Sequence, residues 1–219
     1  IKDSEISKIE NINVVNIGGD FTALFNGLEQ TATYYVSDST GLLKPEIKPA
    51  RPKANITTGS AEYLVISHAD FITGLTPLIE AREADGFMVR VVDVADIYEQ
   101  FNYGVFDANA IKQYIKYAIE NLDTKYVLLV GDDTYDYKNY LDRGAISFVP
   151  SLYMAVGDIV QFATVDPKYT DVNDDDIPDI PIGRFVVKTA SELNNMITKT
   201  LTYEIKDYSD TSLFAADWN

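Results

Sequence analysis

Three short apolar runs, separated by segments with helical spacing, constrain the fold of this chain most strongly. The runs are 62–67 (EYLVIS), 87–92 (FMVRVV) and 126–130 (YVLLV), and each has the length and apolar character of a strand buried on both faces. Helices are expected at 72–85 and 94–101. This alternation predicts an α/β fold, in which right-handed crossovers build a Rossmann-like parallel sheet flanked by helices.

Capping residues predict where two further helices begin. Asp107 occupies an N-cap position ahead of apolar residues at helical spacing. Thr189 and Glu192 form a capping box at the start of a last helix that includes Leu201. These two helices are expected to contribute to the layers that cover the sheet.

The first part of the chain, residues 1–58, has a different character. Short apolar runs are separated by turn residues, and 32–36 has the composition of a strand. Three prolines within 42–56 indicate an extended linker. We therefore expect a small β-rich segment and linker over 1–58, followed by an α/β unit over 59–219.

Charge and composition exclude several classes of protein. The chain has 18 Lys and Arg against 34 Asp and Glu, a net charge of −16, and no basic cluster, which argues against nucleic acid or an anionic membrane surface as a partner. No apolar run approaches the roughly 20 residues that span a bilayer. There is no cysteine and one histidine, His68, so the chain holds no thiol nucleophile. Catalysis by these residues alone would depend on carboxylates, lysine, tyrosine or a metal.

Ligands of parallel sheets bind beyond the carboxyl ends of the strands. This rule indicates His68, Asp93 and the run 131–137 (GDDTYDY) as candidates. Asp132, Asp133 and Asp136 could bind a metal or a cationic substrate, or they could form a solvated turn whose carboxylates accept backbone hydrogen bonds. For His68, a structural hydrogen-bonding role is the more common alternative to catalysis.

A second acidic cluster lies at 170–184 (TDVNDDDIPDIPIGR). Asp171, Asn173 and Asp175 occupy alternate positions, like the first ligands of a calcium loop, and Asp179 could supply a later one. The glycine and glutamate of an EF-hand are missing, so the loop is not an EF-hand. We expect either a calcium site or an exposed acidic tip, and the mutual repulsion of the acids favours a cation.

Several of these stretches together resemble the gingipain-like family of cysteine peptidases. The resemblance covers about 61–208, and it is strongest in 91–105 (VVDVADIYEQFNYGV), in 128–136 (LLVGDDTYD) and in 177–185 (IPDIPIGRF). Residues 1–58 resemble the β-rich segment that often precedes this domain.

The resemblance implies a caspase-like fold of two subdomains, of which this chain contains the first. In the family, a cysteine attacks the scissile carbonyl and a histidine manages the proton, and both belong to the second subdomain. By the same resemblance, Asp158 is a supporting acid near that histidine or part of a pocket for a basic side chain. Ile159 and Val160 stand where the family usually has an aromatic pair. Bound calcium is common in the family.

We therefore expect the amino-terminal part of an extracellular or cell-surface cysteine endopeptidase, inactive alone, with its catalytic His and Cys beyond residue 219. Its partners would be the second subdomain and a protein or peptide substrate. Two alternatives remain: a non-catalytic binding or scaffolding module, and a carboxylate-based metal enzyme. The first hypothesis predicts an apolar surface at one sheet edge, the second a polar, capped edge, and the third converging carboxylates.

Overall fold

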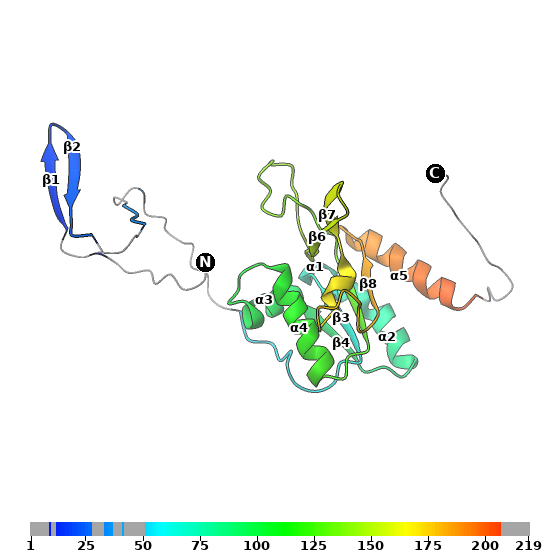
Figure 1. Ribbon diagram of the computed structural model, residues 1–219. Helices are drawn as coiled ribbons and strands as arrows, with labels where there is room; N and C mark the ends of the chain where they lie inside the picture. The colour runs from blue at the N-terminus through cyan, green and yellow to red at the C-terminus, as the bar shows by residue number, and fades with distance from the viewer. Residues whose placement is uncertain (1–8, 10–11, 28–32, 37–40, 42–50, 207–219) are drawn as a thin grey trace. The chain divides into compact units, whose positions relative to one another are not determined.

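The computed structural model describes residues 9, 12–27, 33–36, 41 and 51–206 (Figure 1). The chain divides into two units, Ile1–Ala50 and Arg51–Asn219, each of which is described by itself. None of the helices in the described part of the chain is long and apolar enough to cross a membrane.

A four-stranded parallel sheet forms the centre of the second unit. Its strands are β3 (Tyr63–Ser67), β4 (Val89–Asp93), β5 (Tyr126–Val130) and β8 (Ile182–Phe185), in the order β4-β3-β5-β8. Each of the three central apolar runs of the sequence contributes one strand, which confirms the expected parallel α/β fold. Among the described residues, β8 has a strand neighbour on one side only.

Helices cover both faces of this sheet (Figure 1). They are α1 (Ala69–Ile72), α2 (Thr76–Ala84), α3 (Val94–Phe101), α4 (Ala108–Asn121) and α5 (Ala190–Glu204). Successive residues of a strand point to opposite faces, so Leu64 and Ile66 pack with α3 and α4, while Val65 packs with α1, α2 and α5. The two cores together hold the sheet between helical layers.

The helix expected at 72–85 is divided into two. A short 3-10 helix, η1 (Thr73–Leu75), separates α1 from α2. Pro77 lies in the first turn of α2, where a backbone N–H would have no acceptor within the helix, so proline is tolerated there. Gly74 lies in η1 so close to α5 that an added Cβ would be 2.9 Å from Leu193 Cδ2. The break therefore lets the chain pass close beneath α5.

The segment 51–58 is part of the second unit, although the expected boundary follows residue 58. Ile56 is buried in the core beside α4. The Tyr114 hydroxyl donates to the Ile56 carbonyl at 3.0 Å, and the Tyr117 hydroxyl donates to the Thr57 carbonyl at 2.8 Å. These contacts hold Ile56 and Thr57 against α4.

Two antiparallel hairpins form sheets of their own. In the first unit, β1 (Asn13–Ile17) pairs with β2 (Asp20–Leu24), which agrees with the small β-rich segment expected there. Of the strand expected at 32–36, residues 33–36 form no strand, and residue 32 lies outside the described residues. In the second unit, β6 (Tyr153–Val156) pairs with β7 (Val160–Thr164), and the 3-10 helix η2 (Asp166–Tyr169) follows.

Candidate functional site

The carboxyl ends of the parallel strands lie in one row. Ser67 at the end of β3 is level with Asp93 of β4 and with Val130 of β5. The polar residues here begin the helices that follow: His68 Nδ1 accepts from the backbone N–H of Asp70 at 3.3 Å, and Asp93 caps α3. His68 therefore caps α1, the structural role that the sequence left open beside catalysis.

Asp133 organises the segment that crosses the end of β5. Its carboxylate accepts from the Ser147 hydroxyl at 2.5 Å, from the backbone N–H of Ser151 at 2.9 Å and from the Tyr153 hydroxyl. Burial and the Asp133 carboxylate raise the pKa of Tyr153. With three donors on its two oxygens, Asp133 connects β5 to the base of the β6–β7 hairpin.

The carboxylates of Asp132 and Asp136, in the same run 131–137, have partners different from those of Asp133. Asp136 accepts from the backbone N–H groups of Tyr140 and Leu141, at 2.6 and 2.9 Å, and so holds its own loop. Asp132 Oδ2 lies 3.0 Å from Lys188 Nζ. In the described part of the chain, no three or more His, Cys, Asp or Glu residues are grouped to hold a metal. The carboxylate-based metal enzyme therefore has no converging site here.

Asp158, the supporting acid expected from the family resemblance, lies in the turn between β6 and β7. Its carbonyl accepts from Gln161 Nε2 at 3.1 Å, and no described residue pairs with its carboxylate. Ile159 beside it is 93% exposed. In the described part of the second unit, Asp158 forms no hydrogen bond or ion pair with another candidate residue, and its role stays a prediction.

A buried arginine that the sequence analysis did not single out connects the loops at this edge of the sheet. Arg184 in β8 binds Asp166 with two nitrogens, Nε at 2.7 Å and Nη2 at 2.8 Å. Its remaining bonds go to the carbonyls of Gly131, Val149 and Pro150, at 2.9, 2.6 and 3.2 Å. A planar guanidinium group carries five N–H donors in a fixed arrangement, so one arginine can bind a carboxylate and several carbonyls at once. Arg184 therefore fixes the end of β5 and the start of η2 against β8.

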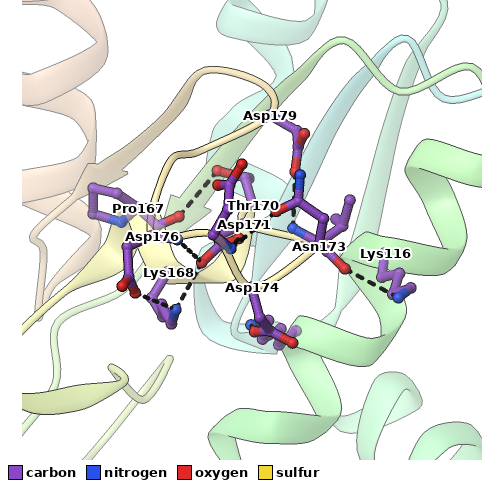
Figure 2. A network of polar contacts seen from close by, with 12 residues as sticks. Lys116, Pro167, Lys168, Thr170, Asp171, Asn173, Asp174, Asp176 and Asp179 are labelled. Atoms are coloured by element: carbon purple, nitrogen blue, oxygen red, sulfur yellow. Dashed lines mark hydrogen bonds and ion pairs between the residues drawn. The ribbon is translucent and has the colours of Figure 1, made fainter.

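The acidic loop 170–179 folds around Asp171, whose side chain is 1% exposed (Figure 2). One Asp171 oxygen accepts from the backbone N–H of Asp175 at 3.0 Å. The other accepts from the backbone N–H of Asp176 at 3.1 Å and from Lys168 Nζ at 2.7 Å. Both oxygens of this expected calcium ligand are thus occupied by hydrogen-bond donors.

The three other expected ligands are engaged in the same way. Asn173 Oδ1 accepts from the backbone N–H of Asp175 at 3.0 Å, and Asp175 Oδ1 accepts from that of Ile177 at 2.9 Å. Asp179 Oδ2 accepts from the backbone N–H of Val172 at 2.9 Å. Calcium needs six to eight oxygens directed at one point. In this arrangement the oxygens hold the turn by accepting backbone amides, and the calcium site stays a prediction.

The comparisons with known proteins identify the family. A sequence profile of Peptidase family C25 matches residues 56–219. The chain belongs to this family. The expected resemblance to gingipain-like peptidases is thereby confirmed. A search of curated proteins found no match.

Two solved structures are similar to this member of family C25. Dimeric latent PorU from Porphyromonas gingivalis aligns with a TM-score of 0.55 and 19% identity, over 65% of this chain and 15% of that one. A structure described as a protease aligns with a TM-score of 0.46 and 23% identity, over 66% of this chain and 28% of that one. The PorU alignment supports the fold alone, and the chain spans a small part of either length.

Proposed function

We propose that this chain is the amino-terminal part of a gingipain-like cysteine endopeptidase and contributes half of the substrate cleft. Membership of family C25 supports hydrolysis of peptide bonds. The 219 residues contain no cysteine, and the single histidine caps a helix. The proposal therefore assigns the catalytic Cys and His to residues beyond 219, and the chain alone would be inactive.

The observation that carries this proposal is the outer edge of β8, along which no described strand pairs. The carbonyls of Pro181 and Phe185 accept from β5, at 3.1 and 3.0 Å. Because alternate residues of a parallel strand face opposite neighbours, Ile182 and Arg184 direct their backbone N–H and C=O groups to the outer edge. An edge of this kind can pair with a further strand. The second subdomain would supply that strand.

The β6–β7 hairpin offers a second surface for the same partner. Its exposed apolar side chains are Met154, Val156, Ile159, Val160 and Phe162. A two-stranded hairpin is marginal in water without a further packing partner. Arg184 binds Asp166 directly after β7, so the hairpin is anchored on the β8 side of the sheet. An apolar surface beside this outer edge favours a missing subdomain over a polar, capped scaffold.

In this proposal the complete domain works by nucleophilic catalysis. A cysteine thiolate would attack the scissile carbonyl, a histidine would transfer the proton to the leaving amine, and backbone N–H groups would stabilise the oxyanion. Asp158, exposed at the hairpin turn, would orient that histidine or bind a basic substrate side chain. We also propose, from the family resemblance, that the peptidase acts outside the cell or at its surface.

The test is the reading frame that follows Asn219 and the activity of the longer chain. We expect a Gly-His-Gly motif and a later cysteine, and hydrolysis of fluorogenic peptides that cysteine alkylation abolishes. Asp158→Asn should reduce this hydrolysis, while Asp142→Asn, which alters another exposed acid, should not. A frame that stops near Asn219, or a longer chain without the two catalytic residues, would contradict the proposal and favour a binding module.

A further inference from the structure

The acidic loop 170–179 concentrates negative charge that some cation must offset. It carries five aspartates within nine residues: Asp171, Asp174, Asp175, Asp176 and Asp179. Like charges at this spacing repel one another unless positive charge lies close to them. Three lysines surround the loop, and each reaches it with its ammonium group: Lys112, Lys116 and Lys168. The protein therefore supplies its own cations here.

Lys168 is the most central of the three. Its Nζ lies 2.7 Å from Asp171 Oδ2 and 2.7 Å from Asp176 Oδ1, and so bridges the buried acid and an exposed one (Figure 2). Lys112 belongs to α4, and its Nζ lies 2.5 Å from Asp174 Oδ1. We propose that the Lys168 ammonium is the internal counter-ion of this loop and takes the place of the calcium ion that the sequence pattern suggests.

The turn and the lysine depend on the same carboxylate. Asp174 and Asp176 have φ values of 61° and 68°, the left-handed conformation that aspartate tolerates better than most residues. This conformation points the N–H groups of Asp175 and Asp176 at Asp171, whose oxygens accept them beside Lys168. Asp171 therefore holds the turn and the Lys168 ammonium at the same time, through the same two oxygens.

The charges of the pair reinforce each other. Hydrogen bonds to Asp171 and Asp176 raise the pKa of Lys168, and the Lys168 ammonium lowers the pKa of Asp171. Both partners are therefore ionised at neutral pH. A loop held in this way folds without metal, whether or not the proposed peptidase activity is correct.

Thermal unfolding of the 219-residue chain tests this inference. The melting temperature in EDTA should equal that in millimolar calcium. Lys168→Met should lower it by roughly 5 °C, because Asp171 stays buried without its partner. The matched control is Lys199→Met, which removes an exposed charge on α5 and should change the melting temperature by less than about 2 °C.

Two results would overturn the inference. The first is a wild-type melting temperature that rises with calcium, and the second is a Lys168→Met variant that unfolds at the temperature of the Lys199→Met control. If Lys168→Met does not fold, amide hydrogen exchange of the wild type in EDTA decides the question. The N–H groups of Asp175 and Asp176 should be protected without metal, and exchange that slows only after calcium is added would contradict the proposal.

Discussion

Replacing Arg184 with methionine should destabilise the second unit more than most single substitutions. The arginine side chain is 8% exposed and forms the two-nitrogen ion pair with Asp166. Loss of one partner of a buried pair costs about 3–5 kcal/mol. The carbonyls of Gly131 and Val149 would each lose the donor that Arg184 supplies, which adds up to about 1 kcal/mol apiece, whereas the Pro150 carbonyl keeps the Tyr169 hydroxyl as a donor. Because neighbouring terms do not add fully, we expect a loss of about 4–6 kcal/mol in the free energy of unfolding.

Urea denaturation of the full chain at neutral pH, followed by circular dichroism, measures this loss. It corresponds to a fall in melting temperature of roughly 10–20 °C. Arg143→Met provides the matched control, because Arg143 is exposed and its side chain forms no hydrogen bond or ion pair with a described residue. That variant should lie within about 0.5 kcal/mol of the wild type.

A double-mutant cycle separates the ion pair from the carbonyl contacts. Asp166→Asn removes the charge that faces Arg184, and the double variant should recover at least 1 kcal/mol of the summed single losses. A loss below about 1 kcal/mol for Arg184→Met would refute the reasoning, since it would mean that solvent replaces every one of these hydrogen bonds.

Four further predictions follow from the same structure. Thr189→Ala should cost about 1 kcal/mol in urea denaturation, because it removes the N-cap of α5. Phe162→Ser, at a side chain that is 69% exposed, should change stability by less than about 0.5 kcal/mol and should reduce the binding of a hydrophobic dye. The fragment 51–219 should unfold with a higher free energy than 59–219, by at least about 2 kcal/mol, because the shorter fragment lacks an isoleucine of the core and its neighbouring hydrogen bonds. The hydrogen bond from Lys168 lowers the pKa of Asp171 below its ordinary value of 3.8, so the ionised carboxylate stabilises the folded chain at neutral pH, and this stabilisation is lost as the pH falls below about 4. Asp171→Asn should therefore make the free energy of unfolding depend less on pH in this acid range.

The central sheet could be predicted because its signals are local. The buried positions of the runs 62–67 and 126–130 are apolar except for Ser67, since both faces of these strands lie under helices. Helix starts were equally local: Asp107 caps α4, and Thr189 forms the capping box of α5 with Glu192. Each of these features needs only a few neighbouring residues to form.

The edge strand β8 could not be recognised in this way. Its sequence, IGRF, contains Gly183 and Arg184, which weaken any strand pattern. The buried side chain of Arg184 is acceptable in this strand because Asp166, 18 residues earlier, neutralises it. That contact exists only after the chain has folded.

The acidic loop illustrates the same difficulty at the candidate site. The alternate residues Asp171, Asn173 and Asp175 have the spacing of calcium ligands whichever way their oxygens point. Their direction depends on the left-handed backbone at Asp174 and on the position of Lys168. Spacing alone therefore indicates a concentration of oxygens, and it cannot distinguish a metal from an ammonium group and backbone amides as their partner.

The loop between Asp133 and Ser147 leaves the sheet and returns to it at one point. The N–H groups of Phe148 and Val149 both reach the carbonyl of Asp132, at 3.0 and 3.4 Å, and Gly131 makes room for them, because a Cβ there would lie 2.7 Å from that of Phe148. Since the base is closed by these bonds, changes in loop length alter only the closure entropy, which grows slowly with length. Residues within this loop can therefore be gained, lost or replaced without disturbing the strands, so its length and sequence can vary independently of the stability of the sheet.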